Sequence, residues 1–364
     1  MSVERFAPNQ FRRATTIRSP SEFRDGRWRT FEPRPPVERA LRGRRWLLRP
    51  GLTFTPYANP TRCNAHCAFC SEELLRIDAD RLSAHRTIDE YDRYFAALGR
   101  AFAELSGFEM GLSLSGLEAT SEPEWLLRLL ALLDEHPALF VERVLYSNGS
   151  GLATDARLVP ALARARFDRA EISRAHFDAK LNHRIMRFDL AQPIRNAQVF
   201  KDTVARTQRE GVPVKLVCIL NDLGVRTIED VERYVDEARE LGVRSVVFRE
   251  LSALGEIYRE NKETRWIDKH RVAVRSLMDE IYTDEARARP GWQLEGVTSG
   301  YYYYNEVYRY LRGEVRVTLE GSSYVAHHEA VESGVLQKLV FHSTRELCGD
   351  WVPNAQRIGS YDER

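Results

Sequence analysis

Cys63-Asn-Ala-His-Cys67-Ala-Phe-Cys70 is the stretch that decides how this chain is interpreted. Three of the five cysteines lie in this stretch, with the spacing C-x3-C-x2-C. Three thiolates so close together can bind three irons of one [4Fe–4S] cluster and leave the fourth iron open to a small molecule. A structural zinc site needs four ligands, usually in two paired arms, and no second pair follows. His66 would have to bend back over its own loop to act as a fourth ligand, so the spacing favours the cluster.

The residue before the third cysteine is Phe69, which completes the pattern C-x3-C-x-(aromatic)-C. With this residue the chain resembles the radical S-adenosylmethionine (SAM) superfamily, and in particular single-cluster members that tailor natural products. The resemblance implies that SAM chelates the open iron and that the aromatic ring packs on its adenine. It also implies that an electron from a flavodoxin or ferredoxin cleaves SAM to a 5′-deoxyadenosyl radical, which abstracts a substrate hydrogen.

Apolar strand patterns alternate with helical patterns on both sides of this loop. We expect strands at residues 51–59, 108–114, 141–146, 167–173, 212–220 and 243–251. Helical spacing of apolar residues lies between them, for example after Thr227, which is suited to cap a helix that stops at Gly242. Six strands that alternate with helices predict an α/β fold with a parallel sheet. The resemblance implies that this sheet is a partial (β/α)6, TIM-like barrel.

Two regions flank the expected barrel at 49–260. Residues 1–48 are rich in arginine and broken by prolines, and we expect an irregular N-terminal arm. Residues 261–364 predict a helix at 266–281 and short strands at 301–310, 314–319, 323–327 and 336–342, which would form an α/β cap over the substrate. This region contains a single cysteine, so a second cluster is not expected.

Active-site residues of such barrels lie at the carboxyl ends of the strands. There, Ser115-Gly116-Leu117-Glu118 resembles the family's G-G-E motif with substitutions, and Ser147-Asn148-Gly149 resembles a T-N-G motif. By the same resemblance, Ser173 is expected at the SAM ribose, Arg184 at its carboxylate and Arg249 near its adenine. The resemblance covers about residues 50–252.

Candidate substrate groups each have an ordinary structural alternative. Two roles are open for Cys348. It donates a hydrogen atom to a substrate radical, or it is simply a buried apolar residue. Glu171 and Lys215 are placed near the strand ends. The two alternatives for them are contact with a polar substrate and a position at a solvated edge of the sheet. Tyr302 and Tyr304 belong to a tyrosine run in which one face lines the pocket or all rings simply pack.

The overall composition bounds the class of protein. The 364 residues carry a formal net charge of +1, which does not favour a nucleic-acid-binding protein, although 13 arginines and 5 acidic residues give residues 1–50 a local charge of +8. No apolar run reaches the roughly 18–20 residues that span a bilayer. Few cysteines fit a reducing compartment, so we expect a cytoplasmic protein without a membrane partner.

The leading functional expectation is a radical SAM enzyme that acts on a small polar molecule, such as a sugar or nucleoside in antibiotic or other secondary-metabolite biosynthesis. The fate of the substrate radical would make it an isomerase, oxidoreductase or lyase, through epimerisation, dehydrogenation or elimination and decarboxylation. The alternative substrate is a peptide. A non-catalytic iron–sulfur protein is a third hypothesis, which the complete cysteine motif disfavours.

Overall fold

The computed structural model describes residues 21–24, 27–30, 34–57, 63–70, 74, 88–252, 254, 258, 260–282, 288–299, 302–311 and 314–362. The centre of the fold is a parallel sheet whose strands follow chain order. These strands are β4 (Arg44–Pro56), β5 (Met110–Leu114), β6 (Phe140–Ser147), β7 (Arg169–Ser173), β8 (Val214–Ile219) and β9 (Ser245–Arg249). All six predicted strands are therefore present, and the α/β fold class is confirmed.

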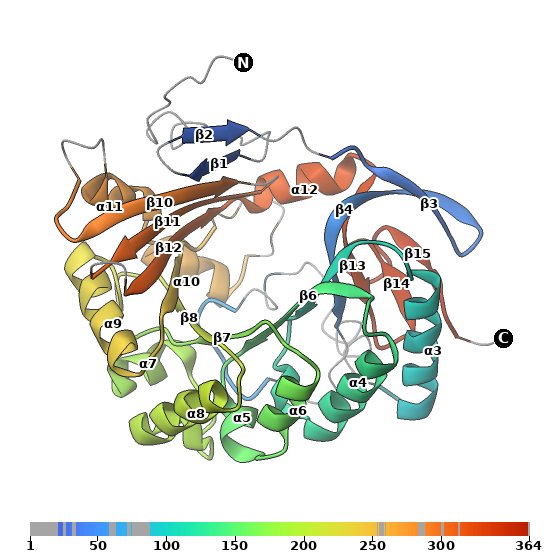
Figure 1. Cartoon of the computed structure of the whole chain (residues 1–364), viewed down its shortest axis with the longest axis horizontal. Helices are drawn as coiled ribbons and strands as arrows, with labels where there is room; N and C mark the ends of the chain where they lie inside the picture. The colour runs from blue at the N-terminus through green and yellow to red at the C-terminus, as the bar shows by residue number, and fades with distance from the viewer. Residues whose placement is uncertain are drawn as a thin grey trace.

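Helices cover the outer face of the curved sheet (Figure 1). They are α3 (Tyr91–Glu104), α4 (Pro123–Glu135), α5 (Ser150–Thr154), α6 (Leu158–Arg164), α7 (Ala179–Met186), α8 (Ala197–Arg209) and α9 (Ile228–Glu240), with 3-10 turns η2 (Ala119–Ser121) and η3 (Pro193–Arg195). The predicted cap of α9 is confirmed, because Thr227 and Asp230 form a capping box. Its apolar residues Val231 and Val235 are fully buried, so the helix is held by packing on the sheet. The sequence also predicts a capping box of Thr87 and Glu90 at the start of α3, and Thr87 lies outside the described residues.

Two C-terminal strands extend the central sheet at both of its edges. β12 (Val315–Ser322) pairs in parallel with β9, and β13 (Val335–Phe341) pairs in parallel with β4. Helix α12 (Tyr324–Glu332) connects the two strands across the open side of the sheet (Figure 1). The predicted strand at 323–327 is wrong, because the Ser323 side chain accepts a hydrogen bond from the N–H of Ala326 and starts this helix. Residues 261–364 thus continue the sheet as well as covering it.

The region after β9 also differs from the predicted single helix at 266–281. It contains α10 (Lys262–His270) and α11 (Val274–Ile281), separated by extended backbone at Arg271. The Arg271 guanidinium donates to the Leu251 carbonyl oxygen and to the Glu250 carboxylate, and Glu250 also accepts from the N–H of Val274. These contacts hold the break against the end of β9. Among the described residues, no helix is long and apolar enough to cross a membrane.

Antiparallel strands complete both ends of the sheet. β11 (Tyr303–Tyr310), β10 (Trp292–Ser299), β1 (Ser21–Arg24) and β2 (Arg27–Thr30) follow β12, while β14 (Glu346–Cys348) and β15 (Arg357–Ser360) follow β13. β3 (Val37–Leu41) pairs with β4. The described part of the N-terminal arm is therefore stranded and not irregular as predicted, because it pairs with distant strands that local sequence does not reveal.

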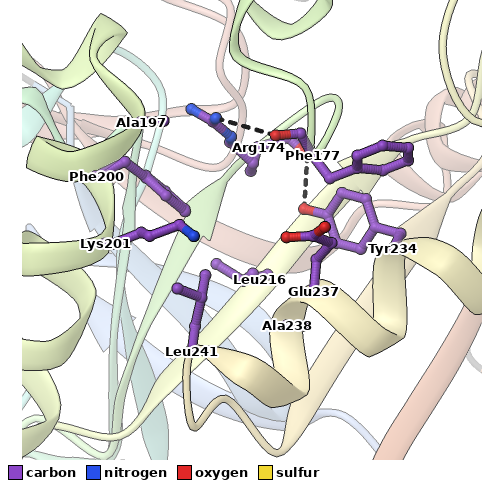
Figure 2. Close-up of a pocket in the computed structure, with 10 residues that line it drawn as sticks. All are labelled: Arg174, Phe177, Ala197, Phe200, Lys201, Leu216, Tyr234, Glu237, Ala238 and Leu241. Atoms are coloured by element: carbon purple, nitrogen blue, oxygen red, sulfur yellow. Dashed lines mark hydrogen bonds between the residues drawn. The ribbon is translucent and has the colours of Figure 1, made fainter.

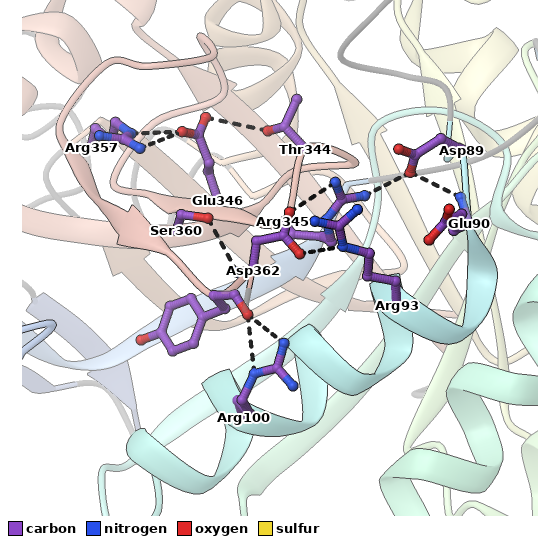
Figure 3. A network of polar contacts seen from close by, with 11 residues as sticks. Asp89, Glu90, Arg93, Arg100, Thr344, Arg345, Glu346, Arg357, Ser360 and Asp362 are labelled. Carbon is purple, nitrogen blue, oxygen red and sulfur yellow. Dashed lines mark hydrogen bonds and ion pairs between the residues drawn. The ribbon is translucent and has the colours of Figure 1, made fainter. Parts of the chain in front are cut away.

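An ion-pair network fastens the C-terminal strands to α3 (Figure 3). The Arg345 guanidinium lies 2.6 Å from a carboxylate oxygen of Asp89 and 3.0 Å from one of Asp362. Arg93 on α3 contacts Asp362 at 2.6 Å. The Arg345 side chain is only 10% exposed, so its pairs are better shielded from solvent than those on the open surface. The network fixes β14 and β15 beside α3.

Candidate active site

A cavity of about 1060 Å³ lies inside the curve of the sheet. It is lined by most of the residues singled out from the sequence, namely Cys63, Cys67, Phe69, Cys70, Ser115, Gly116, Glu118, Ser147, Asn148, Ser173, Arg249 and Tyr302. These residues come from the cysteine loop and from successive strand ends. Residues selected by the strand-end rule, from Cys63 to Arg249, are thus brought together at one cavity.

The cysteine loop is fixed by backbone hydrogen bonds to the segment that ends α7. The N–H of His66 donates to the Arg187 carbonyl oxygen at 3.1 Å, and the N–H of Ala68 donates to that of Ile185 at 3.0 Å. Arg187 has a positive φ of 52°, which turns the chain at the end of α7. The loop is thus held in place by contacts that do not involve its thiols.

Side chains tie the same loop to the turn after β6. The Asn148 amide nitrogen donates to the Asn64 side-chain oxygen at 2.9 Å and lies 3.8 Å from the Cys63 sulfur. Asn64 also donates to the Ser150 hydroxyl at 2.7 Å. Asn148, expected from the resemblance to contact SAM, therefore also positions the first cysteine.

The three thiols face the cavity close to one another. Burial raises the pKa of Cys67, and the neighbouring Cys70 and Cys63 raise it further. Thiolates in such a site need a positive group to stabilise them, and a bound iron–sulfur cluster supplies one. Within the described part of the chain, no three histidine, cysteine, aspartate or glutamate side chains surround a single point as ligands of one metal ion would. Three cysteines that line one cavity are able to bind three different irons of a cluster.

Glu118 joins the loops that follow β5 and β6. Its carboxylate is buried and accepts from the backbone N–H and hydroxyl of Thr120 at 3.1 and 2.5 Å, from the Ser147 hydroxyl at 2.7 Å and from the N–H of Asn148 at 2.6 Å. Burial raises the pKa of Glu118, and these donors partly offset the effect. The carboxylate is therefore engaged mainly with its own protein.

Gly116 is required by the close approach of two aromatic rings to this loop. Its φ is +104°, and a Cβ atom there would lie 2.6 Å from the Tyr57 ring and 3.3 Å from the Trp351 ring. A side chain at this position would need both a strained backbone and a displaced ring. The glycine of the Ser-Gly-Leu-Glu segment thus lets the loop turn against the cavity wall.

Two of the residues expected at SAM differ in their placement. Arg249 lines the cavity and pairs with Glu320 on β12. Burial lowers the pKa of Arg249, but the Glu320 carboxylate outweighs this effect, so the pKa is above the ordinary value for arginine. Arg184 is exposed on α7 and is not among the described residues that line the cavity. The structure therefore does not support the predicted contact of Arg184 with the SAM carboxylate. The prediction rested on the spacing from Ser173, which does not say which face of α7 carries Arg184.

Glu171 and Lys215 are adjacent on β7 and β8 but are not among the described cavity-lining residues. The Glu171 carboxylate is 4% exposed and lies 2.7 Å from Arg169 and 3.3 Å from Lys215. Burial raises the pKa of Glu171, but Lys215 and Arg169 outweigh it, and the net pKa is lowered. The charges neutralise one another inside the sheet, so the geometry favours a structural role over the predicted substrate contact.

Cys348 and Tyr304 are also buried away from the described cavity lining. Cys348 lies in β14 opposite Val340, and burial raises its pKa to about 11. The Tyr304 hydroxyl donates to the Glu306 carboxylate at 2.7 Å. Only Tyr302 of the two predicted tyrosines lines the cavity. Neither Cys348 nor Tyr304 is found in the described cavity wall, because alternation along a strand does not tell which face of the sheet is the inner one.

The C-terminal wall of the cavity carries Lys338 and Trp351, which the sequence interpretation missed, and His327, which the sequence suggested only as a metal ligand. Lys338 on β13, His327 on α12 and Trp351 all line the cavity. The Lys338 ammonium lies 3.2 Å from Nε2 of His327 and 5.3 Å from the centre of the Trp351 indole. The available signal was a lysine, one of six in the chain, within the apolar segment Val335–Phe341.

A second, much smaller cavity lies between α8, α9 and the outer face of the sheet (Figure 2). Its volume of about 40 Å³ suffices for only one or two water molecules. The Arg174 guanidinium lies 4.3 Å above the Phe200 ring, and the Tyr234 hydroxyl donates to the Arg174 carbonyl oxygen at 2.7 Å. This cavity is a packing gap and not a candidate active site.

Comparisons with known proteins support the fold. No family model matches the chain, and no curated protein matches it in sequence. Among solved structures, SuiB from Streptococcus suis is 13% identical with a TM-score of 0.51, and the match covers 87% of this chain and 65% of SuiB. SuiB bound to the precursor peptide SuiA is 14% identical with a TM-score of 0.50, over 86% of this chain and 63% of SuiB. The chain thus spans less than two thirds of SuiB.

A third solved structure is anSMEcpe with bound AdoMet and the Cp18Cys peptide. It is 14% identical with a TM-score of 0.51, and the match covers 86% of this chain and 78% of that protein. At these identities the likeness concerns the fold. The shared fold agrees with the α/β fold expected from the sequence.

Proposed function

We propose that this chain is a radical SAM enzyme that holds one [4Fe–4S] cluster and SAM in the large cavity. The observation that carries the proposal is the convergence of Cys63, Cys67, Cys70 and Phe69 on a cavity at the strand ends. The fold shared with SuiB and anSMEcpe supports it. We interpret the curved parallel sheet as an open barrel around these groups.

When bound, the cluster and SAM would supply the one-electron chemistry needed to remove a hydrogen atom from the substrate. The chain's own residues bind and orient these groups. The three cysteines hold the cluster, Phe69 packs on the adenine, and Ser173 and Arg249 flank the nucleoside. Glu118 acts as a positioning residue, because it orders the loops that carry Ser115, Ser147 and Asn148.

The proposed substrate is a peptide, which is the second of the two substrate classes considered from the sequence. Two of the similar structures contain peptides, SuiA in SuiB and Cp18Cys in anSMEcpe. A cavity of about 1060 Å³ is at the upper end of the usual range for small ligands, and so leaves room for a substrate segment beside SAM. A small polar metabolite is the second candidate, favoured by hydroxyls of Tyr302, Tyr303 and Tyr324 along the wall.

The fate of the substrate radical is proposed from the position of Cys348. Because this thiol is fully buried in β14, the proposal favours outcomes that need no hydrogen atom from it, such as dehydrogenation or elimination. A flavodoxin or ferredoxin is the proposed electron donor.

The test is anaerobic reconstitution followed by measurement of iron and of 5′-deoxyadenosine release with dithionite. We expect about four irons per chain in the wild type and in Cys218→Ala, which removes a buried thiol outside the motif. The triple alanine variant of Cys63, Cys67 and Cys70 should lose the iron and the SAM cleavage. Iron retained by the triple variant, or no SAM cleavage by the reconstituted wild type, would refute the proposal. Peptide and metabolite libraries would then be compared as stimulants of SAM cleavage.

A further inference from the structure

The β13 wall of the cavity presents a cation that no described carboxylate neutralises at ion-pair distance. Lys338 lines the cavity, and its ammonium has three N–H donors, one of which is directed to His327 at 3.2 Å. The opposite wall differs, because Arg249 there is paired with Glu320. The two sides of the cavity therefore have different capacities for an added negative charge.

A bulge brings a second cation to the same wall. In the β13–β4 pairing, Leu336 lies opposite Leu48 and Lys338 lies opposite Thr53, so residues 49–52 of β4 face a single residue of β13, Gln337. Arg49 and Gln337 both line the cavity, and the Arg49 Nε donates to the Gln337 side-chain oxygen at 2.5 Å. Bulges of this kind redirect side chains next to active sites. Here the bulge gathers Arg49, Gln337 and Lys338 on one stretch of wall.

Burial makes the Lys338 ammonium poorly solvated. It lowers the pKa of Lys338 to about 8, against the opposing effect of Asp350. The group is therefore still mainly charged at neutral pH, while its remaining donors lack full hydration. An anionic ligand oxygen at this place would stabilise the charge and satisfy those donors.

The backbone of Lys338 is set back from the cysteine loop. Thr53, its partner on β4, lies three residues before the strand ends at Pro56, which is about 10 Å at the usual rise per residue. The cysteine loop follows beyond that end. The ammonium itself lies 5.3 Å from the centre of the Trp351 ring, and a Cβ atom on Gly116 would lie 3.3 Å from the same ring, so the experiment must distinguish a substrate carboxylate from that of SAM.

We propose that Lys338, with Arg49 and Gln337, binds a carboxylate of the substrate. This inference rests on the proposed function, and it specifies the substrate class as a peptide with an aspartate or glutamate side chain at or next to the modified residue. Lys338 supplies the charge-assisted contact, Arg49 a second donor, and Gln337 orients Arg49. His327 holds the ammonium at the cavity surface.

The test compares two neutral-ended probes on the reconstituted, SAM-loaded wild type. N-acetyl-glutamic acid α-amide carries one carboxylate, and N-acetyl-glutamine amide replaces it with an uncharged group of the same shape. We expect the carboxylate probe to bind roughly tenfold more tightly, as measured by ligand-observed NMR at pH 7. Equal binding of the two probes, or no binding of either, would overturn the inference without the use of any variant.

Variants assign the preference to Lys338. Lys338→Met should abolish it, while Lys201→Met, an exposed lysine on α8, should leave it unchanged. SAM affinity should be retained in both variants, and 5′-deoxyadenosine release should be retained in Lys201→Met. A loss of SAM affinity in Lys338→Met would mean that Lys338 serves the SAM carboxylate instead, which overturns the inference. Absence of SAM cleavage in the wild type would contradict the proposed function itself, so the two failures are distinguishable.

Discussion

Replacement of Glu118 by alanine tests whether this carboxylate organises the site or merely lines it. The change removes the acceptor of the bonds from Thr120, Ser147 and Asn148. Two of the orphaned donors are backbone N–H groups, which cannot turn away to find other partners. Because Asn148 also contacts Asn64 in the cysteine loop, the disturbance should extend to the cluster ligands.

The expected magnitude follows from these four accepted bonds. Each bond to a charged group contributes on the order of 1.5–3 kcal/mol, but water from the adjoining cavity can replace part of the loss. We therefore expect the free energy of unfolding to fall by about 2–4 kcal/mol, close to the cost of breaking a buried ionic contact. The assay is urea unfolding of the cluster-free protein, followed by iron content and SAM affinity after reconstitution. Both iron retention and SAM affinity should fall.

Glu122→Ala is the matched control, because this neighbouring carboxylate makes no side-chain capping bond to α4. It should change the stability by less than about 0.5 kcal/mol, as is usual for a surface substitution. If Glu118→Ala behaves like Glu122→Ala in stability, iron content and SAM affinity, the reasoning about the loop network is refuted.

Three further predictions address the cavity wall and the core. The folded-state pKa of Lys338, about 8, lies below its ordinary 10.5, so between these pH values the folded state binds fewer protons than the unfolded one. The free energy of unfolding of the wild type should therefore rise from pH 8 to 10 relative to Lys338→Met. An unchanged difference in urea titrations would contradict the burial of this charge beside His327. Cys348→Ala should leave product formation per 5′-deoxyadenosine unchanged, and a fall in that ratio would restore the thiol as hydrogen donor. Leu145→Ala, at a fully buried position of β6, should lower the free energy of unfolding by about 2–5 kcal/mol in the same urea assay, and a loss under 1 kcal/mol would be inconsistent with its packing.

The sequence predicts the central fold well because its signals are local. The strands β5 to β9 have five to eight residues and are separated by helices with their own periodicity, and parallel order follows from that alternation. The cofactor residues could be predicted for a related reason. Ser173 ends β7, Asn148 directly follows β6 and Glu118 stands four residues after β5, and the fold brings these strand ends together.

The remaining errors have several physical causes, and the first is pairing between distant segments. The partnership of β13 with β4 leaves no local trace, so the bulge at Arg49 and the cavity-facing Lys338 could not be found. Alternation along a strand or helix also does not say which face is the inner one, and this misplaced Arg184, Glu171 and Cys348. The segment 323–327 was too short for its period to distinguish strand from helix.

The C-terminal strands β13 to β15 continue the sheet from β4, near the start of the chain, and this affects how the structure unfolds locally. Arg49 contacts Gln337 across 288 positions, and Arg93 contacts Asp362 across 269. Such contacts carry the largest loop-closure entropy, so β13 to β15 should join the fold late and detach before the central strands do. In native-state hydrogen exchange, their amides should form a separate unit of lower protection than those of β5 to β8. The wall that carries Lys338 would then detach as one cooperative unit. This local opening would let a bulky substrate enter the cavity while the cysteine loop stays folded.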